Sequence, residues 1–220
     1  MRNVPDNESN KRVGAGRRPA GESAFRRIER LPPLQMMLYL ALVGITVLFG
    51  VLVALYVAAR AHNGPAVGPH AFPRYFSLST VVLLVSSYTL AQAPRLYRAD
   101  DLSNLARCLG ATLLLGCIFS GLQVQGWREL QQQGILFTGE RSSDSFVYFI
   151  TGLHVVHVLV GLGLLLAQLL RTLHAERDAV RTLVFIRNSY HRRQLQLLGT
   201  YWHFIDAIWV VLFGLFLFLY

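Results

Sequence analysis

The stretch Tyr201-Trp202-His203-Phe204-Ile205-Asp206-Ala207-Ile208-Trp209 opens the last long apolar run of the chain, which extends to Tyr220. From Gln194 to Tyr220 the only formal charge belongs to Asp206. A carboxylate inside an apolar spanning segment costs about 2.5–3.5 kcal/mol on insertion scales, so its surroundings must offset that cost. On a helix, Trp202 and His203 lie one turn away from Asp206. The stretch therefore predicts a membrane helix that carries a polar cluster.

The composition indicates an integral membrane protein. Of the 220 residues, 53% are hydrophobic and 15% are charged, whereas a soluble domain carries about 25% charged residues. The net charge of +9 comes from basic residues in the tail and between apolar runs. In those places they set membrane orientation, so we expect no nucleic-acid partner. Cys108 and Cys117 share one apolar run and lie roughly 13 Å apart on a helix, too far for a disulfide within it.

Five apolar runs are each long enough to cross a hydrocarbon layer of about 30 Å. They predict an all-α, polytopic membrane helical bundle with five transmembrane helices, over residues 34–59, 75–94, 108–127, 145–170 and 196–220. Residues 1–31 are polar and rich in Arg, Asn, Gly and Pro, which is typical of a disordered segment. We therefore expect a basic cytoplasmic tail over residues 1–31, followed by a membrane domain over residues 32–220.

Lys and Arg are distributed unevenly between the two sides that five spans define. The N-terminal side has eight in the tail, three in residues 95–107 and six in residues 171–193. The other side has four: Arg60, Arg74, Arg128 and Arg141. Because basic residues concentrate in cytoplasmic loops, we expect the N-terminus inside and the C-terminus outside.

The histidines of the last two runs are the candidates for a haem or metal site. His154 and His157 are three residues apart, and His203 lies in the next run. A haem held by two histidines needs them on facing helices at one depth, but His203 is displaced by roughly 7 Å from the level of His157. The spans also lack the Glu-x-x-His repeats of di-iron sites. We therefore expect hydrogen bonds between helices, to Asp206 among others, with a haem-binding membrane protein as an alternative.

A proton-coupled transporter is a second alternative. An intramembrane carboxyl group such as Asp206, with histidines nearby, could relay protons. However, the sequence shows no internal repeat, and we expect no interrupted helix of the kind that many transporter folds contain. Five spans are also an awkward number for an inverted repeat. These features make transport the less favoured function.

Two motifs point to a known family. Residues 149–161, FITGLHVVHVLVG, look like the signature F-x-TGLH-x-x-HV-x-x-G of subunit III of haem–copper oxidases. Residues 201–209 resemble that family's C-terminal motif YWHF-x-D-x-x-W. The motifs fall on consecutive predicted spans, in the order found in the family. The resemblance covers roughly residues 34–220 and matches the short bacterial form with five helices.

The resemblance implies an accessory subunit without a catalytic centre of its own, in the bacterial inner membrane. In the family, haem and copper belong to partner subunits, which reduce oxygen and pump protons. Subunit III binds none of these cofactors; it packs mainly against subunit I, in a complex with subunit II, and holds phospholipid.

The resemblance also implies roles for individual residues. It implies structural polar contacts for His154, His157, His203 and Asp206. Trp202 and Trp209 match aromatic residues of the same helix, for which we expect packing against lipid or protein. By charge and placement alone, Arg192 and Arg193 are expected to contact lipid headgroups. No residue of this chain is expected to act in catalysis.

Three positions depart from the family pattern. Ile45, Gly126 and Gln196 stand where the family usually has glutamate. These departures indicate a divergent branch and keep open a second assignment, the subunit-III-like protein that accompanies bacterial nitric oxide reductases. The electron donor, cytochrome c or quinol, is also left open because its contacts belong to subunit II.

Overall fold

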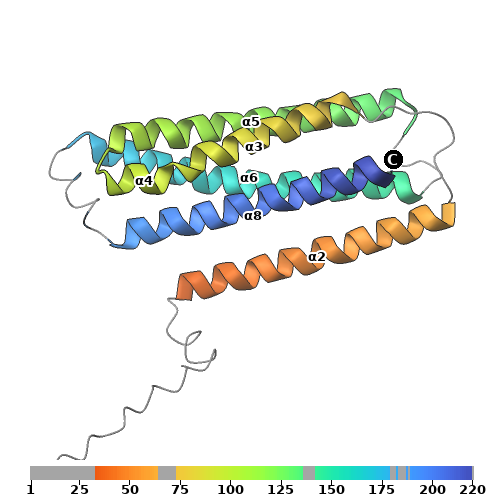
Figure 1. Ribbon diagram of the computed structural model, residues 1–220, viewed down its shortest axis with the longest axis horizontal. Helices are drawn as coiled ribbons and strands as arrows, with labels where there is room; N and C mark the ends of the chain where they lie inside the picture. Colours follow the sequence, from red (N-terminus) through yellow and green to blue (C-terminus); the bar gives the residue numbers. More distant parts are fainter. Residues whose placement is uncertain are drawn as a thin grey trace, which may run out of the picture.

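Long helices running side by side make up the part of the chain that the computed structural model describes, residues 33–63, 73–135, 142–178 and 189–219 with Thr182 and Arg187 (Figure 1). The helices are α2 (Pro33–Asn63), α3 (Arg74–Ala91), α4 (Ala93–Arg98), α5 (Leu102–Gln132), α6 (Ser142–Glu176) and α8 (Ser189–Leu219). The basic tail predicted over residues 1–31 lies outside the described residues.

Five segments of these helices are long and apolar enough to cross a membrane: Pro33–His62, Arg74–Arg98, Leu102–Gln132, Ser145–Glu176 and Tyr190–Leu219. The prediction of five membrane-spanning helices is confirmed. The C-terminal end of α8 lies at the opposite end of the bundle from the start of α2 (Figure 1). This placement follows from an odd number of antiparallel passes.

The helices extend beyond the apolar runs that predicted them, and α5 shows why. Its helix begins at Leu102, six residues before the predicted start, because Asp101 caps it. The Asp101 carboxylate accepts hydrogen bonds from the backbone N–H of Asn104 at 3.0 Å and from its side-chain amide at 2.6 Å. Both hydrogen bonds lower the pKa of Asp101 below its usual value, and the bond from the backbone has the larger effect. Polar helix ends of this kind cannot be found from hydrophobicity alone.

The second span contains a break that the sequence prediction took for its end. Helix α3 stops at Ala91, and α4 resumes at Ala93 with Pro94 in its first turn, continuing to Arg98. Proline fits the first turn of a helix because its missing N–H would have no partner there. The second span is therefore interrupted between α3 and α4, and the expectation that no helix is interrupted is wrong at this point.

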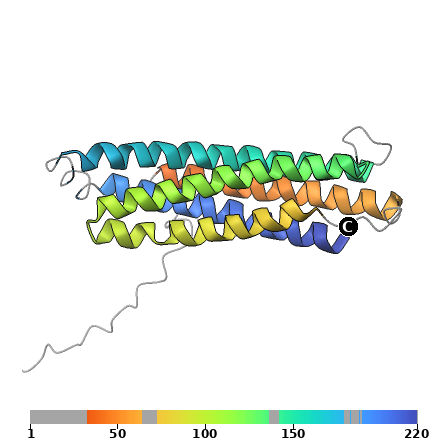
Figure 2. The same cartoon turned by 90° about the horizontal axis from the view of Figure 1, so that it is seen from above.

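Helix α5 packs against both α3 and α6, and α8 lies against α3, α6, α4 and α2. Helix α2 contacts α6 and α8, and its span is the least buried of the five. Figure 2 shows the same bundle turned by 90°, with the helices again parallel to the long axis. The core is formed mainly by aromatic and leucine side chains, and its largest fully buried members include Trp202, Trp209, Tyr56, Phe76 and Phe119.

Candidate functional site

Trp202 of α8 is buried in the bundle, where it contacts α3, α5 and α6. Its indole ring lies against Gly116 of α5 and Gly161 of α6. A Cβ atom at residue 116 would be 2.9 Å from Cη2 of Trp202 and 2.6 Å from a Leu162 methyl group. Any larger residue at position 116 would require Leu162 or Trp202 to shift. The indole N–H donates to the Ser86 hydroxyl at 3.2 Å, which ties α8 to α3.

Trp209 lies two turns further along α8 and joins the same helices. Its indole N–H donates to the Thr80 hydroxyl of α3 at 2.9 Å. Its ring lies beside His154 of α6, with 5.0 Å between centroids, and meets Phe119 of α5 edge-on at 5.3 Å. Phe76 completes the cluster at 6.1 Å. The two family-like motifs are therefore in direct contact through Trp209 and His154.

Indole-to-hydroxyl bonds form a pattern that the sequence analysis missed. The third tryptophan, Trp127, donates to the Thr151 hydroxyl at 3.0 Å. In all three pairs the hydroxyl also donates to a carbonyl of its own helix: Thr80 to Phe76 at 2.8 Å, Ser86 to Leu83 at 2.7 Å and Thr151 to Val147 at 2.7 Å. Each hydroxyl thus uses its proton within its helix and a lone pair between helices. The signal in sequence was a tryptophan at the depth of a serine or threonine on a neighbouring span.

The three histidines lie in different environments and do not converge. His154 is fully buried, and neither ring nitrogen has a hydrogen-bond partner among the residues described. Its ring is enclosed by Trp209, Phe119 and Phe49. Nδ1 of His157 bonds the Leu153 carbonyl of its own helix at 2.8 Å.

The remaining histidine makes a contact between helices. Nδ1 of His203 lies 2.7 Å from the Ser87 hydroxyl of α3. A further bond from α8 reaches the backbone of α6, where the Tyr201 hydroxyl donates to the His157 carbonyl at 3.0 Å. The hydrogen bonds expected from the histidines to Asp206 are therefore absent within the described part of the chain.

Asp206 is buried, with 4% of its surface exposed. Neither carboxyl oxygen has a hydrogen-bond partner in the described residues. The expectation that neighbouring indole and histidine donors offset its burial is wrong, because those donors turn toward α3. The Ser87 hydroxyl lies near the carboxyl group, but its hydrogen bond joins it to His203. Helix spacing correctly predicted that Trp202 and His203 lie near Asp206. It could not predict the directions of their side chains, which depend on how α8 is rotated about its axis.

The arrangement holds helices together and offers no evident ligand set. In the described ranges, no three His, Cys, Asp or Glu side chains gather as they would around a metal ion. Hydrogen bonds between α3, α5, α6 and α8 account for Thr151, Tyr201, Trp202, His203 and Trp209 of the two motifs. His157 bonds within its own helix, and His154 and Asp206 have no hydrogen-bond partner among the described residues. The expectation that this chain binds no haem stays a prediction.

The predicted lipid-contacting arginines lie at the start of α8. Arg192 and Arg193 are both exposed, and Arg193 borders a small hollow shared with Pro33 and Gln35 of α2. A larger hollow of about 290 Å³ lies beside it, between α2, α6 and α8. Its walls are mainly leucine, with polar groups from Gln168 and Arg171.

Gln168 and Arg171 line this hollow, and the sequence analysis did not single them out. The Arg171 guanidinium donates to the Gln194 side chain at 2.8 Å. Gln168 is buried, and its amide nitrogen has no partner in the part of the chain that is described. The available signal was an amide one helical turn before an arginine at the end of an apolar run. Arg171 was counted only toward membrane orientation.

Comparison with known proteins settles the family. Residues 63–220 match the family model described as cytochrome c oxidase subunit III. The chain belongs to the cytochrome c oxidase subunit III family. It is 32% identical over 177 residues to cytochrome c oxidase subunit 3 of Bacillus sp. (strain PS3), covering 80% of each chain. It is 30% identical over 178 residues to the protein of the same name in Bacillus subtilis (strain 168), covering 80% of this chain and 81% of the relative.

A relative with a different name is also similar. The chain is 27% identical over 136 residues to the probable quinol oxidase subunit 3 of Staphylococcus haemolyticus, covering 62% of each chain. The resemblance inferred from the two motifs is therefore confirmed at the level of the family. The chain is accordingly a multi-pass membrane protein of the subunit III family.

The structure gives a physical reason for one departure from the family's glutamates. A Cβ atom at Gly126 would lie 2.6 Å from Cε1 of the Phe76 ring, so a glutamate does not fit there unless Phe76 moves. Ile45 is partly buried and packs against the core from α2. Gln196 is exposed near the start of α8. The three positions lie on three helices and form no common site.

Proposed function

We propose that the chain is an accessory, non-catalytic subunit of a haem–copper terminal oxidase that stabilises the catalytic subunit and binds phospholipid. Membership of the subunit III family supports the association with an oxidase. The observation that carries the structural role is the contact between the two motifs. The ring centroids of His154 and Trp209 are 5.0 Å apart, and the indole N–H groups of Trp202 and Trp209 donate hydrogen bonds to α3. Side chains occupied in this way serve packing, and oxygen reduction belongs to partner subunits I and II.

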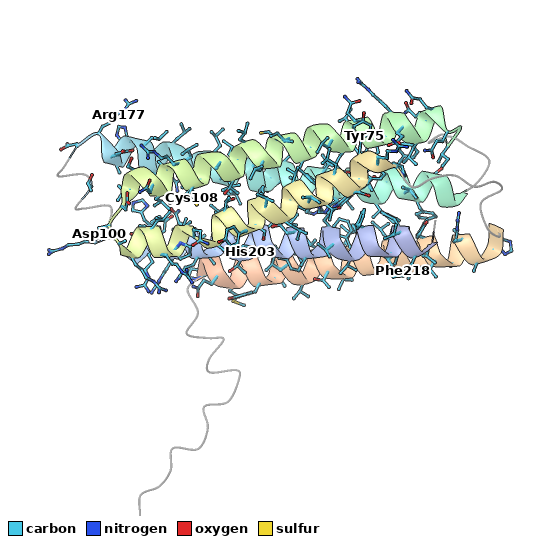
Figure 3. The ribbon with its side chains drawn as sticks, turned by 45° about the horizontal axis from the view of Figure 1, so that its top comes forward. Tyr75, Asp100, Cys108, Arg177, His203 and Phe218 are labelled. Carbon is cyan, nitrogen blue, oxygen red and sulfur yellow. The ribbon has the colours of Figure 1, made fainter. Side chains whose placement is uncertain are left out.

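The proposed membrane is the bacterial plasma membrane, with the N-terminus inside. Bacterial relatives support the compartment, and the distribution of Lys and Arg supports the orientation. Asp100 and Arg177 lie at one end of the bundle and Tyr75 at the other (Figure 3). The end that carries Arg177 also receives Arg95 and Arg98 of α4 and Arg171 of α6, and we assign it to the cytoplasm.

The hollow beside α2 supports the proposal of phospholipid binding. Arg171 offers a guanidinium group, which pairs well with phosphate. The buried amide of Gln168 offers a further donor without a partner. Leu34, Leu38 and Leu164 line the same hollow and form an apolar wall suited to an acyl chain. Donors for phosphate beside a hydrocarbon wall match the two parts of a phospholipid.

Purification of the affinity-tagged chain from membranes of its native host tests this function. We expect haem-containing oxidase subunits to co-purify and the preparation to consume oxygen. Activity with reduced cytochrome c against activity with a quinol then identifies the donor, which the differently named relatives leave open. Recovery of nitric oxide reductase subunits would support the alternative assignment. Recovery of the chain without any haem protein would contradict both.

A further inference from the structure

The surface of α2 shows what a lipid-facing side of this bundle looks like. Over residues 40–55 its exposed side chains other than Thr46 are hydrocarbon, including Leu40, Val43, Val47 and Val51, whereas the exposed Tyr39 lies closer to the start of the helix. Thr46 is also exposed, but its hydroxyl donates to the Leu42 carbonyl of its own helix at 2.8 Å. This stretch of α2 can therefore face lipid chains, which supply no hydrogen bonds, without leaving an exposed polar group unpaired.

Helix α8 presents a different exposed surface. We name the α8 ridge as the four exposed residues Gln196, Thr200, His203 and Ala207, which follow one another at helical spacing. The hydroxyl of Thr200 is satisfied by the Gln196 carbonyl of its own helix at 3.0 Å. His203 makes no bond to its own helix; its ring is exposed, and Figure 3 shows it on α8 beside α3.

The position of His203 makes its exposure costly in lipid. It lies next to the midpoint of the 31-residue helix Ser189–Leu219. One ring nitrogen bonds Ser87, and the other has no partner among the described residues. An imidazole at mid-membrane is too short to reach the headgroup region, as lysine or arginine side chains do near helix ends. The second nitrogen therefore needs a protein group to bond with.

Two grooves flank the α8 ridge and leave room for such a group. The groove toward α3 and α4 has a volume of about 320 Å³, and its lining includes Ala91, Pro94 and Gly199. The groove toward α2 has a volume of about 330 Å³, and its lining includes Gly50 and Ala207. Small residues such as these allow close approach of a further helix, as they do at helix contacts within membranes.

We propose that the α8 ridge is the docking face for a transmembrane helix of the catalytic partner subunit. That helix carries a hydrogen-bonding side chain at the depth of His203 and fills the groove beside α3. The inference rests on the proposed function, since it assigns the face through which an accessory subunit holds its partner. A lipid does not meet the requirement, because an acyl chain offers neither a donor nor an acceptor.

A photo-crosslinking amino acid introduced in the native host tests the face. We place it at Thr200 or Ala207 on the α8 ridge, and at Leu40 or Val47 on α2 as controls, in the tagged full-length chain. We expect a covalent product with the haem-containing catalytic subunit, identified by mass spectrometry, from the α8 ridge and not from α2. Products from α2 alone, or products with lipid or a second copy from the α8 ridge, would overturn the docking face.

Substitutions at His203 test the hydrogen bond. We expect His203→Leu to lower recovery of the catalytic subunit about tenfold. This is the change that the loss of one of the stronger hydrogen bonds between membrane helices produces. His203→Gln, which keeps a donor and an acceptor, should restore recovery. Ser87→Ala is the matched control: it removes the internal bond of His203 and leaves the outer nitrogen, so recovery should stay near wild type.

The outcomes separate the docking face from the proposed function. Equal losses in Ser87→Ala and His203→Leu would mean that only internal packing was disturbed, which overturns the docking role. Unchanged recovery in His203→Leu would overturn it as well. In both cases the wild-type chain would still bring down its partner, and the proposed function would stand. A wild-type chain that recovers no haem–copper subunit would overturn both proposals together.

Discussion

Replacing Trp209 by phenylalanine removes one indole N–H and keeps an aromatic ring at the meeting point of the two motifs. The lost bond to Thr80 is 2.9 Å long. Bonds between membrane helices contribute about 0.6 kcal/mol on average and up to about 1.7 kcal/mol. Thr80 keeps its own bond to the Phe76 carbonyl, so only an acceptor lone pair is left unpaired. With the small void left by the indole, we expect Trp209→Phe to lower the free energy of unfolding by about 1–2 kcal/mol.

Trp209→Leu should cost more because it also removes the ring contacts. Trp209 meets His154, Phe119 and Phe76, with centroids 5.0, 5.3 and 6.1 Å away. Each aromatic pair contributes about 0.5–1.5 kcal/mol. We therefore expect a loss of about 3–5 kcal/mol for Trp209→Leu, in the range seen for truncation of buried aromatic residues. Unfolding of the purified chain in mixed micelles, followed by tryptophan fluorescence and circular dichroism, measures both values.

Two controls make this test decisive. Val47→Leu, on the exposed surface of α2, should leave the free energy of unfolding unchanged. In a double-mutant cycle of Trp209→Phe with Thr80→Ala, the coupling energy should equal the bond between the two side chains, below about 1.7 kcal/mol. If the free energy of unfolding of Trp209→Leu equals that of the wild-type chain, the motifs do not hold the bundle together and the structural reasoning is refuted.

The remaining predictions concern the carboxyl groups, the glutamate positions and the hollow beside α2. Asp206→Asn should raise the free energy of unfolding by up to about 3 kcal/mol, because a neutral amide replaces a buried carboxylate that no donor satisfies; a preserved fold with lost ion flux in liposomes would favour a transporter instead. Gly126→Glu should destabilise the chain by about 1–3 kcal/mol, the usual cost of overpacking, and the same substitution should cost less when it is made in a Phe76→Ala background, where the clashing ring is gone. Arg171→Gln should reduce the phospholipid retained through purification, as measured by lipid mass spectrometry, without unfolding the chain. Because the pKa of Asp101 is lowered on folding, its stabilising cap is present above the unfolded value of about 3.9 and is lost as pH falls through the lower folded value; the hydrogen-exchange protection factors at the start of α5 should then fall, and protection factors that do not change with pH there would contradict the cap.

The number and approximate place of the spans could be predicted from sequence because each apolar run is long and lacks charge. The ends could not, since they depend on local caps and breaks such as Asp101 and Pro94. Hydrophobicity records which segment prefers lipid. It does not record how far the helix continues into the headgroup region, which is why all five helices are longer than their apolar runs.

Side-chain partners were harder to predict than neighbourhoods. Helix spacing placed Asp206 near Trp202 and His203, and the sequence alone suggested that they bond to one another. The structure turns the donors of Trp202 and His203 toward hydroxyls of α3, more than a hundred residues earlier in the chain. Which face of α8 meets α3 is decided by packing of the whole bundle, and no local pattern carries that information.

The glycine at position 126 illustrates the same limit. In the sequence it is only a missing glutamate. In the structure it makes room for the ring of Phe76, which comes from another helix and in turn packs on Trp209. The substitution is therefore tied to the aromatic cluster at the junction of the motifs. A reader of the sequence could find the departure but not its cause.

The cofactor content of the separated subunits tests the central claim most directly. The tagged complex is purified from native membranes and dissociated in detergent, and each chain is isolated for a reduced-minus-oxidised spectrum and metal determination. We predict haem and copper with the partner subunits and no stoichiometric haem or transition metal with this chain. A stoichiometric haem spectrum carried by this chain alone would contradict its role as an accessory subunit.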